Sequence, residues 1–383
     1  MAIELKRTPL FAAHQKLGAR LVEFGGWEMP VQYSSIVDEH LAVRRAAGLF
    51  DISHMGELRF TGASALGFLN HTLTNDLRRL AVGQGQYTLM CNERGGAIDD
   101  LYAYRTGENE FLLVVNASRI EADAAWLEKQ LAAWPERHQV SFENVSEQLG
   151  AVALQGPRVI EFIDACFAGA SVSETRVSRA SDLTKNQLGV FDSEGNNIYL
   201  ARTGYTGEDG FEIIAPAKAI EAVWNRILAV GHAYCLQPAG LGARDTLRTE
   251  VCYPLYGHEL NEHTTPIEAG LGSFVALEKS DFVGRSVLAE QKEKGVSKKC
   301  VAFKMTGKTA PPRPGYPIWT TGAAAAKVGE VVSGTQSPSL GIGIGLGYVP
   351  SALAKPGVAI EIEIRGKRAP ATTVSKPIYR KGA

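Results

Sequence analysis

The chain has 383 residues, of which 45% are hydrophobic and 21% are charged, and its formal net charge is −1. This length allows two or three domains with large cores, and the small net charge gives no overall field that would favour nucleic acid or an anionic membrane. The sequence has no apolar run of signal-peptide length and no stretch of about 18 apolar residues, so neither export nor a membrane span is expected. Five cysteines, without a C-x-x-C pair, favour free buried thiols in the cytosol over a disulfide framework or a zinc site.

The first 60 residues predict two helices followed by a strand. Ser35 and Asp38 have the spacing of a capping box, which begins the second helix. The expected ranges are a helix over 10–19, a turn-rich segment over 25–33, a helix from Ser35 to about Gly48, and one strand over 50–60, where FDISHMGELRF alternates.

The middle of the chain combines hairpins with helices. IDDLYAYR and EFLLVVN flank TGEN, which is typical of a hairpin turn, and IYLARTGYT and FEIIA flank GEDG in the same way. Ser118 and Glu121 resemble a second capping box, so a helix is expected from there through Leu131. Further expected elements are a strand over 152–156, a helix over 157–166 with Pro157 in its first turn, and helices over 219–230, within 238–251 and over 283–295.

After Gly295 the sequence pattern changes to short apolar segments with strand character, separated by many glycines and several prolines. This pattern predicts an all-β terminal domain. The region before it shows no regular βαβ alternation, so α+β is favoured over a doubly wound α/β fold. The expected domains are a discontinuous α+β domain over 1–50 and 145–290, an inserted α+β domain over 51–144, and a β-barrel over 291–383.

Two motifs are misleading. GIGIGLG (341–347) contains G-x-G but lacks the third glycine and the following helix of a dinucleotide site, so a glycine-rich barrel strand is expected. The histidines of HELNEH, His258 and His263, are five residues apart, so one helical face cannot present both to a zinc ion. The sequence therefore predicts neither a nucleotide site nor a metal site.

Asp99 and Asp100 lie inside an apolar strand, where carboxylates are uncommon. Side chains alternate across a strand, so only one aspartate can face a given pocket. Asp100 shares its face with Tyr102 and Tyr104 and is the better candidate. The alternative is an edge-strand charge that discourages aggregation.

Three further features are candidates for the same site, and two of them, Arg244 and His54, have a structural alternative. Glu212 occupies a strand position between Phe211 and Ile213, where a buried carboxylate needs a partner. Arg244 follows the glycines of GLGARD just inside a helix, although Arg244 with Asp245, or Arg248 with Glu250, could be plain ion pairs. His54 is more often a satisfied core histidine than a base, and Met55 offers an adaptable apolar surface to a flat ring.

Together these residues suit a pteridine ring. Its amino-pyrimidine edge offers two parallel donors to a carboxylate, its carbonyl accepts from arginine, and its faces contact tyrosine or methionine.

The sequence also resembles a known family, the T-protein of the glycine cleavage system. The stretches that carry the resemblance run from residue 7 to about residue 380 and include RTPLFAAHQKLGARLVEFGGWEMPVQY, GLFDISHMGE, MCNERGGAIDDL, ARTGYTGEDGFE, PAGLGARDTLR and GEVVSGTQSPSLGIGIGLGYV. The one departure is Ala201, where the family often has serine.

The resemblance implies three domains in a cloverleaf around a folate pocket. It matches Asp100 to the family's catalytic aspartate, and Glu212 and Arg244 to the residues that hold the folate ring. Arg380, in the tail, matches a basic residue that contacts substrate. Five more residues match positions that line the pocket: Met55, Tyr87, Tyr104, Asn116 and Tyr205.

The implied reaction takes the methylene carbon of an aminomethyl group on the lipoylated H-protein to tetrahydrofolate and releases ammonia, without a metal or nucleotide cofactor. Two relatives of the same fold are alternatives. One is a folate-dependent demethylase of a methylated sulfonium compound. The other is a non-catalytic iron–sulfur maintenance protein, whose K-G-C-x-x-G-Q motif is replaced here by SDFVGRSV, with Phe282 and no cysteine. Sarcosine-type oxidoreductases need a flavin domain, for which no motif is present.

Overall fold

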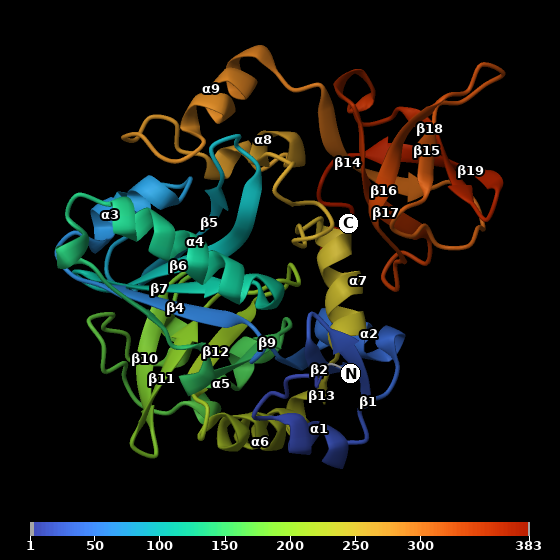
Figure 1. Ribbon diagram of the computed structural model, residues 1–383. Coiled ribbons are helices and arrows are strands. Elements are labelled where there is room, and N and C mark those ends of the chain that lie inside the picture. The colour runs from blue at the N-terminus through green and yellow to red at the C-terminus, as the bar shows by residue number, and fades with distance from the viewer. Residues whose placement is uncertain (1–3, 382–383) are drawn as a thin grey trace. The chain divides into compact units, whose positions relative to one another are not determined.

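The computed structural model describes residues 4–381 (Figure 1). Contacts within the chain divide it into two compact units: residues up to Thr88 with Asp100–Arg244, and Leu89–Asp99 with the residues from Asp245 onward.

The first unit contains a six-stranded sheet in the order β10-β11-β12-β9-β3-β13. Its neighbours pair antiparallel, except β13 with β3, which are parallel. The strands are β3 (Ala47–Asp51), β9 (Leu149–Gln155), β10 (Leu188–Ser193), β11 (Asn196–Ala201), β12 (Gly210–Pro216) and β13 (Leu236–Pro238).

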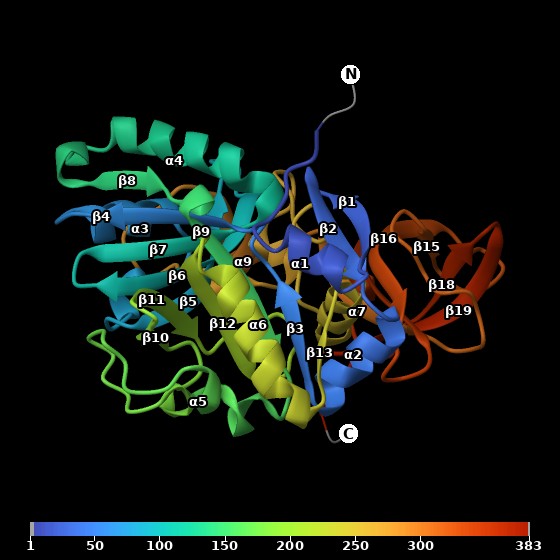
Figure 2. The same cartoon turned by 90° about the horizontal axis from the view of Figure 1, so that it is seen from below.

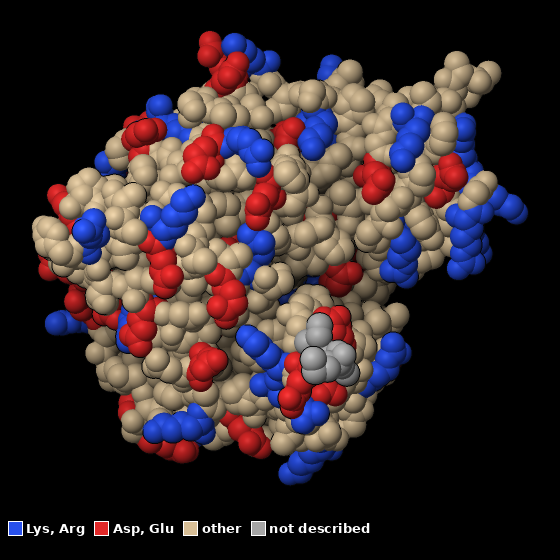
Figure 3. All heavy atoms as spheres, in the orientation of Figure 1, with Lys and Arg blue, Asp and Glu red and all other residues tan. Residues whose placement is uncertain are grey.

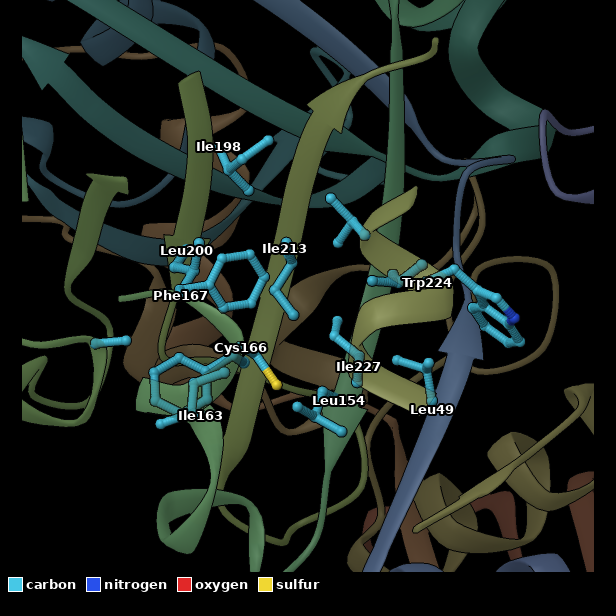
Figure 4. Close-up of a cluster of buried hydrophobic side chains, with 14 of the residues drawn as sticks. Leu49, Leu154, Ile163, Cys166, Phe167, Ile198, Leu200, Ile213, Trp224 and Ile227 are labelled. Carbon is cyan, nitrogen blue, oxygen red and sulfur yellow. The ribbon is translucent and has the colours of Figure 1, made fainter. Parts of the chain in front are cut away.

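Helix α6 (Ile220–Gly231) packs along β9 and β12 (Figure 2). It buries Ile220, Val223, Trp224 and Ile227, whose spacing places them on one helical face. These side chains meet apolar residues of the sheet and of the short helix α5 (Ile163–Cys166) in a dry core (Figure 4). This core therefore lies between α6, α5 and one face of the six-stranded sheet.

A five-stranded sheet, which lies in the same unit except for the end of β5 and the start of β6, has the order β5-β6-β7-β4-β8. Its strands are β4 (Gly56–Thr61), β5 (Gln84–Cys91), β6 (Ala97–Gly107), β7 (Glu110–Val115) and β8 (Ser141–Asn144). Helices α3 (Ala65–Thr72) and α4 (Ile120–Ala133) contact each other, and Phe60 of β4 lies 5.7 Å from Phe68 of α3 between ring centroids. The hairpin expected around TGEN is confirmed, because β6 and β7 pair antiparallel.

The prediction of one strand over 50–60 was wrong. β3 ends at Asp51 and β4 begins at Gly56, and the two strands belong to different sheets. The intervening turn is fixed by hydrogen bonds that alternation cannot reveal: Ser53 N–H donates to the Asp51 carboxylate at 2.8 Å, and Ser53 Oγ donates to the carbonyl of Ala151 at 3.0 Å.

One of the two predicted capping boxes begins a helix. Ser35 caps α2 (Ile36–Arg45), because its Oγ accepts the N–H of Asp38 at 3.1 Å. Ser118 instead lies inside a 3₁₀ turn, and α4 begins at Ile120 after Arg119 without a side-chain cap. The spacing alone did not distinguish the two, because the extended residue Asn116 directly follows β7 and leads straight into the 3₁₀ turn.

Other helix predictions were too long at the chain's N-terminal end and after Pro157. α1 covers only Phe11–Lys16, and the segment after Pro157 forms one 3₁₀ turn and the single turn of α5. A short antiparallel pair, β1 (Arg20–Phe24) and β2 (Trp27–Gln32), follows α1, so most of the segment expected to be turn-rich, 25–33, is a strand.

The second unit contains the closed barrel β14-β17-β16-β15-β18-β19, which confirms the all-β prediction. Its strands are β14 (Lys298–Met305), β15 (Pro317–Trp319), β16 (Lys327–Gln336), β17 (Gly343–Pro350), β18 (Ala359–Ile364) and β19 (Lys367–Val374). GIGIGLG runs into β17, where a Cβ on Gly345 would lie 2.5 Å from the Phe303 ring. The glycines therefore serve barrel packing, as expected.

Helices α8 (Pro266–Ala269) and α9 (Arg285–Lys294) precede the barrel in this unit. Gly295 ends α9 with a φ of 84°, as predicted. α7 (Leu241–Val251) runs from the end of the first unit into the second.

The α+β class with a C-terminal barrel is confirmed, while the division into three domains stays a prediction. None of the helices in residues 4–381 is long and apolar enough to cross a membrane. Four of the five cysteines are buried, but Cys235 is exposed, which corrects the expectation that all are buried. Acidic and basic side chains are interspersed on the face drawn in Figure 3.

Candidate active site

Asp100 lies in an interior strand. β6 has β5 on one side and β7 on the other, so the edge-strand interpretation of its two aspartates was wrong. Asp100 is 9% exposed and Asp99, on the opposite face, is fully buried. A carboxylate in such a position must be hydrogen-bonded.

Both oxygens of Asp100 accept hydrogen bonds from predicted site residues. The Tyr87 hydroxyl donates to Oδ2 at 2.8 Å, and Asn116 Nδ2 donates to Oδ1 at 3.1 Å. Asn116 Nδ2 also lies 2.9 Å from the carbonyl oxygen of Asp100. Tyr87 comes from β5 and Asn116 directly follows β7, so the neighbouring strands hold the carboxylate in one orientation.

Two tyrosines continue the face of β6 that carries Asp100. The ring centroids of Tyr102 and Tyr104 are 5.0 Å apart. Space for both rings depends on Gly85 in β5, where a Cβ would lie 2.4 Å from the Tyr104 ring and 2.9 Å from the Tyr102 ring. Tyr104 is only 1% exposed. Its side chain therefore packs behind the surface of the site, although the sequence predicted that it lines the pocket.

Glu212 sits in β12, between β11 and β9, and is half-buried. Its Oε2 accepts a hydrogen bond of 2.8 Å from the hydroxyl of Thr203, and that hydroxyl lies 3.2 Å from the hydroxyl of Tyr104. Tyr104 thereby connects the face of Asp100 to Glu212. Thr203 was not singled out from the sequence, because its contact with Tyr104 spans 99 residues of chain.

Arg244 is held at the start of α7. Its guanidinium carbon lies 4.5 Å from the centroid of the Tyr205 ring, a cation–π geometry. The glycines before it do allow close approach, since a Cβ on Gly240 would lie 2.4 Å from the carbonyl carbon of Val31.

The structure gives other partners to residues of the two suggested ion pairs, Arg244 with Asp245 and Arg248 with Glu250. Asp245 pairs with Arg248 at 2.7 Å, and Arg248 also reaches Glu259 at 3.0 Å. Glu250 instead accepts from the hydroxyls of Ser337 and Ser339.

Buried Gln155, which sequence reasoning missed, anchors the loop that carries both Thr203 and Tyr205. Its Nε2 donates to the carbonyl of Thr203 at 3.0 Å, and its Oε1 accepts from the Thr206 hydroxyl at 2.9 Å. A glutamine at the end of a buried strand, as in LQGP, is the one sequence signal that could have suggested this role.

The turn between β3 and β4 brings His54 near Arg244 and leaves Met55 half-buried. Burial lowers the pKa of His54 to about 4; Asp51 raises this pKa and the Arg244 charge lowers it further. The ring is therefore neutral at pH 7. In the part of the chain that the structure describes, its Nδ1 has no hydrogen-bond partner, so the expectation of a satisfied core histidine was only half right.

Arg380 is exposed and belongs to the second unit, so its assignment stays a prediction. Two cavities elsewhere, of about 530 Å³ in the 170–178 loop and about 80 Å³ beside Arg59 and Tyr199, are lined by none of the predicted site residues.

Family models match nearly the whole chain. The GCVT N-terminal domain matches residues 10–279, and the glycine cleavage T-protein C-terminal barrel domain matches residues 298–380. The chain belongs to the glycine cleavage T-protein family.

Full-length relatives agree with this membership. An aminomethyltransferase of Bacillus subtilis (strain 168) is 45% identical over 98% of this chain and all of its own length. One of Lysinibacillus sphaericus (strain C3-41) is 46% identical over the whole of both chains. The crystal structure of the glycine cleavage system aminomethyltransferase T from Bartonella henselae is 33% identical, with a TM-score of 0.88 over 98% of each chain.

Proposed function

We propose that Asp100, Glu212 and Arg244 form the working site of a tetrahydrofolate-dependent aminomethyltransferase of the glycine cleavage system. The enzyme transfers the methylene carbon of an aminomethyl group to tetrahydrofolate and releases ammonia. The donor in this proposal is the lipoyl arm of the H-protein. The observation that carries the residue assignment is the buried carboxylate of Asp100, whose two oxygens are held by Tyr87 and Asn116.

Glu212 and Arg244 would bind the pterin ring. A carboxylate accepts the two parallel donors of the amino-pyrimidine edge, and a guanidinium donates to the ring carbonyl. The half-buried Glu212 and the Arg244–Tyr205 stack supply these groups from one unit of the chain. Met55, from the turn after β3, would contact a face of the ring.

Asp100 would act at the reacting carbon. The aminomethyl carbon is at the formaldehyde level, so the transfer requires no redox step. Folate N5 and then N10 each form a bond to the carbon, while the carbon–sulfur bond and the bond from carbon to the amino group break. The protons released from N5 and N10 pass to the leaving groups, which depart as ammonia and the thiol of the carrier, so the oxidation level of the carbon is unchanged. The Asp100 carboxylate would orient the folate, stabilise the transient positive charge and assist proton movement.

The proposed location is the cytosol, where reduced thiols such as the five free cysteines of this chain persist. No observation favours the demethylase or the iron–sulfur maintenance protein as a second function.

The test is Asp100→Asn, which keeps the size of the side chain and removes its charge. We expect ammonia release that depends on lipoylated H-protein to fall by about 10²–10⁴-fold at saturating tetrahydrofolate, the range of general acid–base catalysis. The unfolding temperature serves as the control for the fold. Equal activity of the two proteins would remove Asp100 from this role.

Ring binding is tested separately with Glu212→Gln and Arg244→Ala. Each should weaken tetrahydrofolate binding in calorimetry by about tenfold or more, since a hydrogen bond to a charged group is worth about 1.5–3 kcal/mol. Unchanged affinity in either variant would contradict that residue's assignment and leave the assignment of Asp100 standing.

A further inference from the structure

Thr203 links two residues of the candidate site, Tyr104 and Glu212, through its side-chain hydroxyl. Its hydroxyl lies 2.8 Å from Glu212 Oε2 and 3.2 Å from the hydroxyl of Tyr104. Thr203 is 9% exposed and Tyr104 is 1% exposed, so water competes little for either group.

The direction of the two hydrogen bonds follows from the number of protons. A threonine hydroxyl has one proton, and here it donates to the Glu212 carboxylate. Tyr104 must then donate to Thr203. Burial, together with the charge of Glu212 and with Tyr102, raises the pKa of Tyr104 well above its ordinary value, so its phenol keeps the proton that it donates.

The two hydrogen bonds that run from Tyr104 through Thr203 to Glu212 constrain the carboxylate. A donor on Oε2 restricts rotation about the last bond of the Glu212 side chain. In residues 4–381, Oε1 of Glu212 takes part in no hydrogen bond that the structure shows, so this oxygen remains for an outside donor.

The position of Thr203 is itself fixed by the backbone. Gln155 Nε2 donates to the Thr203 carbonyl at 3.0 Å, and a Cβ on the next residue, Gly204, would lie 1.8 Å from Gln155 Oε1. The hydroxyl therefore approaches Glu212 from a loop that is anchored independently of any ligand.

We propose that Thr203 is a positioning residue, which holds the Glu212 carboxylate in the plane required to accept both donors of the pterin's amino-pyrimidine edge. The inference rests on the proposed ring-binding role of Glu212. Tyr104 acts through Thr203 by orienting its hydroxyl, and neither residue needs to touch the substrate.

The experiment compares Thr203→Val, which keeps the shape and removes the hydroxyl, with Thr203→Ser, which keeps the hydroxyl. Tetrahydrofolate affinity is measured by calorimetry, and kcat is measured with lipoylated H-protein. The valine variant should bind about tenfold more weakly, as expected for loss of a hydrogen bond to a charged group. Its kcat at saturating folate should stay within about twofold, because the Asp100 side chain keeps its partners; serine should restore the affinity.

The control is Thr72→Val. Thr72 is also buried, and its hydroxyl donates to carbonyls of its own helix, those of Phe68 and Leu69. Its removal should leave folate affinity unchanged. Equal loss of affinity in the Thr72 and Thr203 variants would overturn the proposal.

A double-mutant cycle separates positioning from a purely structural role. In a Glu212→Gln background, Thr203→Val should change affinity by less than about twofold, because the group that it positions is already altered. A second tenfold loss in that background would overturn the proposal.

Two further outcomes are distinguishable. If Glu212→Gln alone leaves affinity unchanged, the ring-binding role fails and the positioning role fails with it. If Glu212→Gln weakens binding and Thr203→Val does not, only the positioning role fails.

A second variant is used if Thr203→Val does not fold. Tyr104→Phe removes the hydroxyl that donates to Thr203. A loss of affinity of about threefold supports the proposal, and unchanged affinity overturns it.

Discussion

Two buried carboxylates flank the turn between β3 and β4 and differ in their partners. Asp51 ends β3 and accepts from the Thr8 hydroxyl at 2.7 Å, from His14 Nε2 at 2.9 Å and from the Ser53 N–H at 2.8 Å. Glu57 lies one residue inside β4, is 1% exposed, and its Oε1 has no hydrogen bond within residues 4–381.

The pKa values of these carboxylates diverge accordingly. Burial raises the pKa of Asp51, but the hydrogen bond and charge of His14, with Ser53 and Thr8, outweigh it, so the pKa lies below the ordinary value. Burial alone raises the pKa of Glu57 to about 8. At pH 7 Asp51 is therefore ionised and Glu57 is protonated, although both are buried. The difference comes from the hydrogen-bond donors that surround Asp51.

The largest effect is expected from Asp51→Ala. It leaves Thr8, His14 and the Ser53 N–H without their acceptor, and removing one partner of a buried pair costs about 3–5 kcal/mol. Urea unfolding at pH 7 measures the loss. Asp192→Ala, at an exposed position of β10, is the control and should change stability by less than about 0.5 kcal/mol; a similar loss in both would show that the Asp51 cluster contributes nothing special.

The stability that Asp51 adds should also depend on pH. Its folded pKa is lowered, so its contribution is present above the ordinary pKa of 3.8 and is lost as the pH falls through the folded pKa. The difference between wild type and Asp51→Asn should therefore shrink on acidification. A difference that stays constant down to the acid transition would contradict the assignment.

The next effect is expected from Glu57→Gln. The stability that the Glu57 carboxyl contributes depends on pH in the opposite direction to that of Asp51. The raised pKa means that the folded state binds more protons than the unfolded state between about 4.5 and 8. As the pH rises through that window, the free energy of unfolding of the wild type should fall by about 1.4 kcal/mol per pH unit relative to that of the variant. Above the window the difference between the two proteins should stay constant. Denaturation at pH 5, 7 and 9, with exposed Glu147→Gln as the control, measures this; parallel curves for wild type and Glu57→Gln would refute it.

The smallest effect compares the two predicted helix starts. Ser35→Ala should cost about 1 kcal/mol, because Ser35 caps α2, whereas Ser118→Ala should cost almost nothing. Thermal unfolding of the two variants side by side measures the difference. Equal losses would mean that Ser118 has a role that the 3₁₀ turn does not reveal.

Local rules predicted the parts of the molecule that local contacts determine. Alternation along β6 separated Asp100 from Asp99, the Ser35 spacing located a real cap, and glycine-rich short strands indicated the barrel. In each case the deciding neighbours lie on the same strand, the same turn or the adjacent strand.

The failures share another origin. The break after Asp51 depends on Thr8 and Ala151, and the support of Glu212 depends on Tyr104, 99 residues from Thr203. Such contacts join distant segments and leave no periodic pattern in the sequence. Asp100, Glu212 and Arg244 were grouped from the sequence by the chemistry that a pteridine ring requires and by family resemblance, since no local pattern connects them.

The boundary between the two contact units crosses the β5–β6 hairpin on both strands, after Thr88 and before Asp100. The hairpin's tip therefore belongs with the C-terminal half of the chain, where the Ala97 N–H donates to the Thr264 carbonyl and Asn92 Nδ2 donates to the Glu262 carbonyl. A gene truncated after Arg244 would encode both strands of the hairpin but delete the carbonyl acceptors of Thr264 and Glu262. The tip of the hairpin, which ends at Asp99 beside Asp100, would lose these hydrogen bonds and fray. Anyone seeking a minimal folate-binding fragment should therefore keep the chain whole.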